Sequence, residues 1–152
     1  LIIVRSFSKA FSGAGLRFGY VISQSENIRE LEKVMTIFHL NLMTQAYVCT
    51  ILDNQELFLE NNRKVIAQKQ IVFSELQHTE GILVHSSATN FLTFSAGEHS
   101  EALFNFLSDH DIAIRPVWHH PVLVNHLRVT ISGMEEENRL FLSKVKEFIN
   151  HL

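Results

Sequence analysis

The first half of the chain shows two kinds of apolar pattern, continuous runs and helical spacing. Runs rich in β-branched and aromatic residues at 1–4 and 17–22 predict two strands, the first of the type found inside a buried sheet. Ser25 is placed to cap a helix, because apolar residues recur at intervals of three and four positions just after it: Ile28, Leu31, Val34, Met35 and Phe38. A second helix is expected over 42–52, and one long helix without Gly or Pro over 55–77.

Beyond Gly81 the pattern changes to short elements. Four apolar runs predict strands, at 82–84, 91–94, 112–114 and 127–132. Amphipathic spacing predicts two helices, over 100–110 and 135–151, and three glutamates in the first turn of the second favour the positive end of its dipole. The order strand-strand-helix-strand-strand-helix predicts a small α+β domain with an antiparallel or mixed sheet.

Composition narrows the range of functions. The net charge of −3 and the isoelectric point near 6.3 argue against binding to nucleic acid or to a membrane surface, which requires a basic face. No apolar run approaches the roughly 20 residues of a transmembrane helix. The one cysteine, Cys49, excludes an internal disulfide framework, suits a reducing cytoplasm and is expected to be a small core residue.

Residues 6–17 concentrate reactive and phosphate-binding side chains directly after the first predicted strand. A lysine flanked by small hydroxyl residues can attack a carbonyl as an amine and form a Schiff base. Hydroxyls, flexible backbone and a guanidinium can bind an attached phosphate. The segment lacks the third glycine of a dinucleotide-binding fingerprint and the G-K-[ST] of a P-loop. The composition of the segment therefore favours a phosphorylated carbonyl compound as its ligand.

In its form S-x-S-K-A-F-x-x-x-G-L-R-x-G-Y, this segment resembles the cofactor-lysine motif of the fold-type I aminotransferases, and most of all their histidinol-phosphate aminotransferase branch. The resemblance implies pyridoxal 5'-phosphate as cofactor, with Lys9 as the catalytic residue that binds it covalently and moves the substrate proton. It also implies that Ser6, Ser8 and Arg17 hold the cofactor phosphate. The substrates implied are an amino donor and a 2-oxo acid acceptor, and the enzyme implied is a cytoplasmic homodimer without nucleic-acid or membrane partners.

Two arginines interrupt apolar strand sequence, Arg115 in Ile-Arg-Pro and Arg128 in Leu-Arg-Val-Thr. A guanidinium flanked by apolar strand residues needs a partner once it is desolvated. Both match arginine positions of the same family, at the same separation of thirteen residues. The resemblance implies that Arg128 grips a substrate carboxylate, and that in the histidinol-phosphate branch the pair binds the substrate phosphate. The alternative is an internal salt bridge with Glu135, Asp111 or another acid.

The remaining polar candidates carry weaker signals. Asn90 matches a small-x-N-F segment of the family, which implies a place near the substrate, although turn chemistry explains an Asn at a strand start equally well. Nine histidines invite a metal hypothesis, but the adjacent His119 and His120 point in divergent directions. Even with His126 nearby, no ligand spacing such as H-x-x-x-H occurs, so no metal site is expected.

Enzymes of this family are more than twice as long as the chain, which implies that these 152 residues are the carboxyl-terminal half of a larger enzyme. In the family fold, which combines α/β and α+β architecture, residues 1–65 would end the large cofactor-binding domain. Residues 66–152 would form a small α+β domain, joined through the long helix. The acid that pairs with the pyridine nitrogen and the aromatic that stacks on the ring lie upstream of Leu1 in the family, so the chain alone is expected to be inactive.

Three alternatives remain open at this point. A threonine-phosphate decarboxylase and an aromatic amino-acid aminotransferase share the fold and the lysine motif. A phosphate-binding regulatory module, in which Lys9 never forms a Schiff base, would be no enzyme at all. The lysine motif alone does not separate the first two from the histidinol-phosphate branch, whereas trapping of a lysine adduct would separate all three enzymes from the regulatory module.

Overall fold

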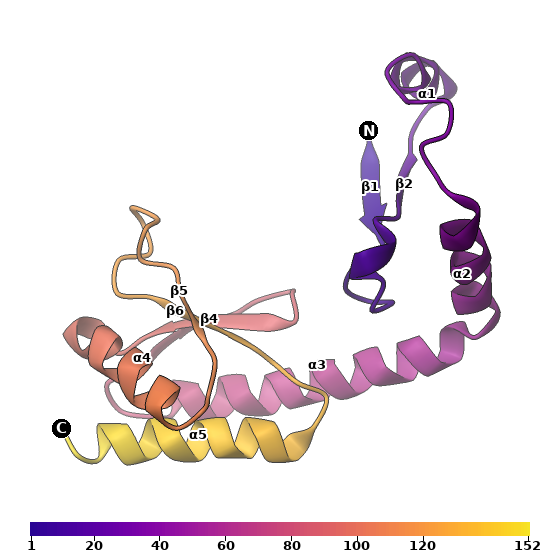
Figure 1. Ribbon diagram of the computed structural model, residues 1–152. Helices are drawn as coiled ribbons and strands as arrows, with labels where there is room; N and C mark the ends of the chain where they lie inside the picture. The colour runs from indigo at the N-terminus through magenta and orange to yellow at the C-terminus, as the bar shows by residue number, and fades with distance from the viewer. The chain divides into compact units, whose positions relative to one another are not determined.

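The structure, a computed structural model, describes residues 1–152 and divides into two compact units, residues 1–62 and 63–152 (Figure 1). The long helix α3, Gln55–Gln77, contributes to both units and has the limits that the sequence predicts. The other elements of the first unit are β1 (Ile3–Ser6), η1 (Ala14–Leu16), β2 (Gly19–Ile22), α1 (Ser25–Glu32) and α2 (Leu42–Asp53). None of the helices combines the length and the apolar character that crossing a lipid bilayer requires.

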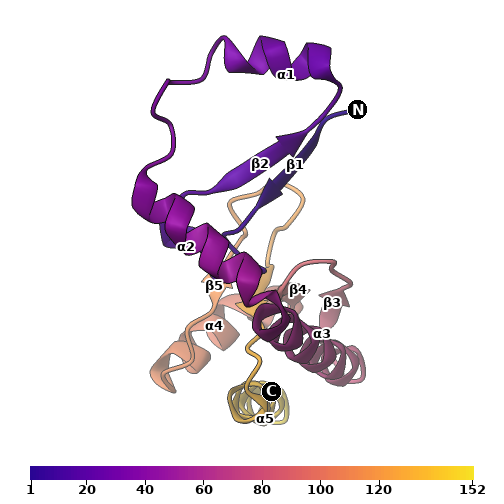
Figure 2. The same ribbon diagram turned by 90° about the vertical axis from the view of Figure 1, so that its right-hand side faces the viewer.

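Strands β1 and β2 form an antiparallel pair, in register from Ile3 opposite Ile22 to Ser6 opposite Gly19 (Figure 2). Both predicted strands are therefore confirmed: the first is shifted by two residues towards the carboxyl terminus, and the second begins two residues later than predicted and ends at the predicted residue. Within this chain the two strands pair only with each other, and every residue of both is exposed.

Helix α1 is shorter than its apolar spacing predicts. Ser25 is its first residue, and the N-cap is Gln24, whose side chain makes no capping bond. The helix ends at Glu32, because the next amides bond three residues back: Val34 to the carbonyl of Leu31 and Met35 to that of Glu32. The apolar side chains beyond that point, Val34, Met35 and Phe38, lie outside the helix and are exposed.

Helix α2 confirms the second helical expectation. The side chain of its N-cap residue, Asn41, accepts a hydrogen bond of 2.9 Å from the amide of Thr44. Its buried positions, Thr44, Val48 and Ile51, follow helical spacing along one face. Cys49 falls off that face and is exposed, so its expected place in the core is wrong.

The small core of the first unit holds the loop between β1 and β2. Buried Phe7 packs with Val48 and Ile51 of α2. The ring of Phe7 also stacks on Phe11, with centroids 4.5 Å apart, and meets the edge of Phe18 at 4.8 Å. The apolar residues of the lysine segment thus anchor its polar residues, which alternate with them along the chain.

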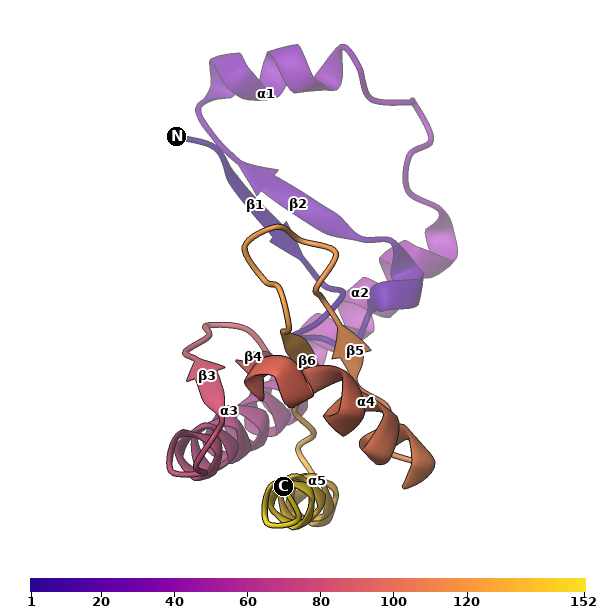
Figure 3. The ribbon, with the colours of Figure 1, turned by 90° about the vertical axis from the view of Figure 1, so that its left-hand side faces the viewer.

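The second unit has the four-stranded sheet that the sequence predicts, and every pair in it is antiparallel. The spatial order is β3-β4-β6-β5, where the strands are Leu83–His85, Phe91–Ser95, Leu127–Thr130 and Arg115–Pro116. The helical elements are η2 (Gly97–His99), α4 (Ser100–Asp109), α5 (Glu135–Ile149) and the remainder of α3. The loop of residues 117–126 rises from the ends of β5 and β6 (Figure 3).

The strand expected at 112–114 does not form, and β5 comprises only Arg115 and Pro116. After α4 the chain turns through Asp111, whose φ is 58°, and the amide of Ile112 returns to the carbonyl of Leu107 at 2.9 Å. Ile112 and Ile114 instead pack against the core as partly buried side chains. A helix-ending turn therefore uses the residues that β-propensity assigns to a strand.

The core of the second unit lies between one face of the sheet and three helices. Helices α3 and α5 run side by side there (Figure 1), linked by Lys146 to Glu75 at 2.6 Å and by Asn138 to Gln68 at 3.2 Å. The buried side chains alternate along the central strands: Leu92 and Phe94 of β4, Leu127 and Val129 of β6. The residues between them consequently point to the opposite face of the sheet.

Candidate active site

The hydroxyls of Ser6 and Ser8 lie together at the end of β1. Ser6 Oγ donates to Ser8 Oγ at 2.9 Å, and the amide of Ser8 donates to Ser6 Oγ at 3.1 Å. Phe7, between them, is buried, which directs both serines to the other side of the chain. Local sequence alone builds this pair, because the Ser6 hydroxyl accepts from the amide two residues on, which turns the chain after β1 and brings the two serines together.

Lys9 is the next residue, in a turn that backbone hydrogen bonds close. Its carbonyl accepts from the amide of Ser12 at 3.0 Å, and the amide of Gly13 donates to the carbonyl of Phe7 at 2.9 Å. The side-chain amide of Asn62 holds the carbonyl of Ala10 at 3.0 Å. The Lys9 side chain is exposed, so its amine is accessible to a small carbonyl compound.

Arg17 lies where the loop that contains Lys9 returns to the second strand. It has a left-handed backbone, with φ of 51°, and its guanidinium donates to the carbonyl of Ala14 at 3.2 Å. The amide of Phe7 bonds the carbonyl of Phe18 at 3.2 Å, so Ser8 and Arg17 leave the same end of the strand pair. The structure thus brings the predicted phosphate-binding residues to one end of one hairpin, beside Lys9.

The two candidate arginines of the second unit are direct cross-strand partners, Arg115 on β5 opposite Arg128 on β6. The guanidinium of Arg128 lies over the ring of Phe91, 5.0 Å from its centroid, whereas Arg115 is exposed. Glu135, an acid that could have neutralised them, pairs with Arg139 instead. The sheet register therefore places Arg115 and Arg128 side by side, although they are thirteen residues apart in sequence.

Like charges placed directly opposite on neighbouring strands repel each other. Segments 82–97 and 112–134, which include all four strands, contain no Asp or Glu that could offset the charge of Arg115 and Arg128. The cation–π contact of Arg128 offsets only a part, about 0.5–1 kcal/mol at an exposed site. An anion bound between the guanidiniums would remove the repulsion, so this face of the sheet is suited to a carboxylate or phosphate.

Asn90 directly precedes β4, half-buried, and its carbonyl accepts from the amide of Ile131 at 2.9 Å. The loop before it is held by Lys69, whose ammonium donates to the carbonyl of Thr89 at 2.9 Å and also to that of Ser87. Lys69 escaped the sequence analysis. The available signal was its place on the buried stripe of α3, four residues after Val65 and three before Val72, where a charged side chain needs a partner.

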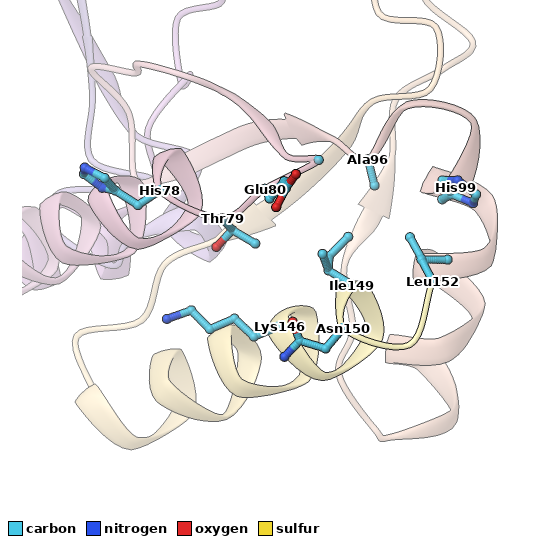
Figure 4. A pocket seen from close by; sticks show the side chains of 10 residues that line it. His78, Thr79, Glu80, Ala96, His99, Lys146, Ile149, Asn150 and Leu152 are labelled. Atoms are coloured by element: carbon cyan, nitrogen blue, oxygen red, sulfur yellow. The ribbon is translucent and has the colours of Figure 1, made fainter.

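One hollow of the second unit lies away from these residues. Figure 4 shows this hollow of about 500 Å³, where the end of α5 faces the turn after α3, and it contains none of the predicted site residues. Lys146, on its wall, hydrogen-bonds Glu75 and lowers the pKa of that carboxyl. This ion pair joins two helices and serves the packing of α3 against α5. No three His, Cys, Asp or Glu side chains cluster as metal ligands would.

Comparison with known proteins identifies a family. The model of the family "Aminotransferase class I and II" matches residues 1–145. Histidinol-phosphate aminotransferase 2 of Legionella pneumophila (strain Lens) is 37% identical over 151 residues, which cover 97% of this chain and 39% of that protein. The chain thus spans well under half the length of the curated relatives it matches.

Solved structures of aminotransferases are also similar to this chain, and the chain again covers less than half of each. Histidinol-phosphate aminotransferase from Sinorhizobium meliloti, in complex with pyridoxal 5'-phosphate, is 26% identical with a TM-score of 0.79, covering 99% of this chain and 41% of that one. Histidinol-phosphate aminotransferase from Clostridium acetobutylicum has a TM-score of 0.87 at 24% identity, covering 100% of this chain and 46% of that one. Because the sequence identity of this second structure is only 24%, its similarity shows a shared fold and nothing about function.

Replacing Gly19 by alanine should open the strand pair that holds the lysine loop, because the added Cβ would lie 2.6 Å from the carbonyl oxygen of Arg5. We expect Gly19→Ala to speed hydrogen exchange at the Phe7 amide by about tenfold or more. Gly15→Ala is the matched control, since a Cβ there meets no atom within 4 Å. Equal exchange rates in the two variants, measured by NMR, would contradict this role of Gly19.

Proposed function

Because the chain belongs to the aminotransferase class I and II family, we propose that it forms part of an enzyme that transfers the amino group of histidinol phosphate to 2-oxoglutarate, with pyridoxal 5'-phosphate as cofactor. The observation that carries the proposal is the unneutralised pair Arg115 and Arg128, directly opposed on neighbouring strands. The names of the relatives support the same substrate. The reaction belongs to histidine biosynthesis.

We assign the two parts of the chain to two domains of that enzyme. Residues 1–65 end the large cofactor-binding domain, and residues 66–152 form the small domain, with α3 passing from one to the other. The division of the structure into compact units between Asn62 and Arg63 supports a boundary within this helix. The intact enzyme is a homodimer, as is usual in the family, and the chain alone has no sustained activity.

The lysine loop fits the cofactor. The adjacent hydroxyls of Ser6 and Ser8 and the guanidinium of Arg17 would hold its phosphate, since hydroxyl donors and a cation are the groups that phosphate oxygens accept from. Lys9 would hold its carbonyl carbon covalently until a substrate amine takes its place. When bound, pyridoxal phosphate supplies an electron sink for the charge that develops at the substrate α-carbon.

Lys9 then acts as the base. Its freed Nζ would move the proton from the substrate α-carbon to the cofactor in the first half of the transfer, and from the cofactor to the α-carbon of the other substrate in the second half. A lysine in an exposed turn has the reach for this, because its four-carbon stem leaves the amine free to move between neighbouring atoms. The serines and Arg17 keep the reacting group in place during both steps.

The arginines bind an anionic group of the substrate. Arg128 forms a bidentate fork with a carboxylate or a phosphate, and Arg115 adds a second guanidinium that suits a dianion better than a carboxylate. The ring of Phe91 supports Arg128 from one side and restricts its side chain. Asn90 directly precedes β4, and its role in this proposal is to contribute a polar group for the substrate.

Lys9→Ala in the full-length enzyme should reduce kcat by about 10²-fold to 10⁴-fold or more, because both the covalent link and the proton transfer depend on its amine. Some cofactor binding should remain, since Ser6, Ser8 and Arg17 still hold the phosphate. Absorbance of the bound cofactor and turnover are the two measurements. The control is Lys33→Ala, an exposed lysine paired with Glu30 at 2.5 Å. Turnover by the Lys9 variant at the rate of the Lys33 variant would refute the assignment.

Arg115→Ala should separate phosphorylated from unphosphorylated substrates. Removing one charge-assisted hydrogen bond to the phosphate should cost about 1.5–3 kcal/mol, or roughly tenfold to a hundredfold in kcat/KM. We expect that decrease for histidinol phosphate and little change for an unphosphorylated aromatic amino acid. Arg128→Ala should weaken the binding of both substrates, because a carboxylate uses Arg128 as well.

The difference between the two arginine variants decides the substrate class. Steady-state kinetics gives kcat/KM for each variant relative to the parent enzyme with each of the two substrates, and these four ratios are compared. Equal decreases on both substrates from Arg115→Ala would make Arg115 a structural residue, and the enzyme an aromatic or broad-specificity aminotransferase.

A further inference from the structure

The two arginines belong to a longer row that crosses the whole sheet of the second unit. His85 on β3 is paired with Thr93 on β4, Thr93 with Arg128 on β6, and Arg128 with Arg115 on β5. Directly opposite residues of antiparallel strands point to the same face. All four side chains therefore lie on one face of the sheet. The other face is the core face, which carries the buried residues Leu92, Phe94, Leu127 and Val129.

His126, two residues before Arg128, joins this row through His85. The Nε2 atoms of the two histidines lie 2.9 Å apart, and their rings are stacked with centroids separated by 5.1 Å. Nδ1 of His126 lies 2.8 Å from the carbonyl oxygen of Val124. Thr93, which is small, leaves the space above β4 in which rings from β3 and from the segment before β6 can meet.

These contacts assign the protons of the pair. A carbonyl oxygen only accepts, so Nδ1 of His126 must carry a proton, and the neutral ring then accepts at Nε2. His85 must consequently donate from its own Nε2. The free position for another proton is Nδ1 of His85, and a proton there makes the ring a cation without breaking either hydrogen bond. A second added proton would place two N–H groups against each other, so the pair takes up one.

In the strands and in the loop between β5 and β6, the other charged or titratable groups are Arg115, Arg128, His119 and His120, and the Lys69 ammonium bonds the loop that precedes β4. Acids occur in the connections outside these segments, at Glu80, Glu98 and Asp111. No Asp or Glu occurs in segments 82–97 and 112–134.

We propose that the His85–His126 pair is a proton-accepting extension of the arginine row, so that this face binds a tetrahedral dianion more tightly after the pair has taken up one proton. The inference rests on the proposed function for the identity of that dianion, the phosphate group of the substrate. The pair is a specificity-determining element, since its added positive charge strengthens the binding of a doubly charged phosphate more than the binding of a singly charged carboxylate.

Binding and protonation are coupled in both directions. An anion on the row attracts a proton to His85, and a proton on His85 raises the affinity for the anion by the same factor. Histidine side chains change charge between about pH 5 and 8, so the effect should appear in that window. Affinity for the dianion should rise as the pH falls through it.

Inorganic sulfate is the probe of choice, because it keeps two negative charges throughout this window, whereas a phosphate monoester takes up a proton near pH 6. Binding of sulfate to the 152-residue chain can be followed by NMR signals of the histidine rings at about pH 6 and pH 8, in a background of constant chloride. We expect sulfate to bind roughly threefold to tenfold more tightly at the lower pH.

Variants identify the groups responsible. His85→Gln should abolish the pH dependence, and His126→Gln, which removes the partner of the His85 ring, should reduce it. Both should leave the affinity at pH 8 within about twofold, since the arginines remain. His119→Gln is the matched control, an exposed histidine of the same loop region that makes no contact with His85, and should retain the full pH dependence. Both test positions are at least partly exposed, and circular dichroism verifies that the variants fold.

Each outcome decides between the inference and its premise. A pH dependence that survives in both histidine variants, or a chain that binds no sulfate at either pH, overturns the role of the pair. If Arg128→Ala lowers sulfate affinity at both pH values while the histidine variants behave as the parent chain, the arginine site stands and the histidine extension falls. Failure of the proposed transamination is recognised separately, by full turnover of the Lys9→Ala enzyme.

Discussion

The pairing register of β4 with β6 is the constraint on which the second unit depends. It places Leu92 opposite Val129 and Phe94 opposite Leu127, so that one face of the sheet is apolar and meets the helices. The same register places Thr93 opposite Arg128 on the other face. A slip of one residue would turn Arg128 into the core and the leucines to solvent. Burial of the core therefore also fixes the anion-binding row.

The sequence predicts elements well where one local rule governs them. The long helix Gln55–Gln77 has no Gly or Pro, and it forms with its predicted limits. The turn after β1 brings the hydroxyls of Ser6 and Ser8 together, and Phe7, between them in sequence, is buried. The lysine motif was recognisable for the same reason, since its residues are close in sequence and need no distant partner to be interpreted.

Features that depend on distant partners could not be predicted. The apolar spacing after Ser25 does not show whether a neighbouring surface is present for these side chains to pack against. Val34 and Met35 lie beyond the end of a shorter helix and are exposed. Cys49 suits a core by residue type, yet the face of α2 that packs is set by Phe7. The pairing of His85 with His126, 41 residues away, follows only from the strand order.

The central claim, that Lys9 is the cofactor lysine, is tested most directly by chemical trapping. Borohydride reduction of the full-length enzyme with bound pyridoxal phosphate makes the lysine adduct a stable secondary amine, which tryptic peptide mapping can locate. The account predicts a label on Lys9, within the peptide from Ser6 to Arg17, because trypsin cleaves after Arg5 and no longer after modified Lys9. A label confined to another lysine, or no stable label, would contradict it.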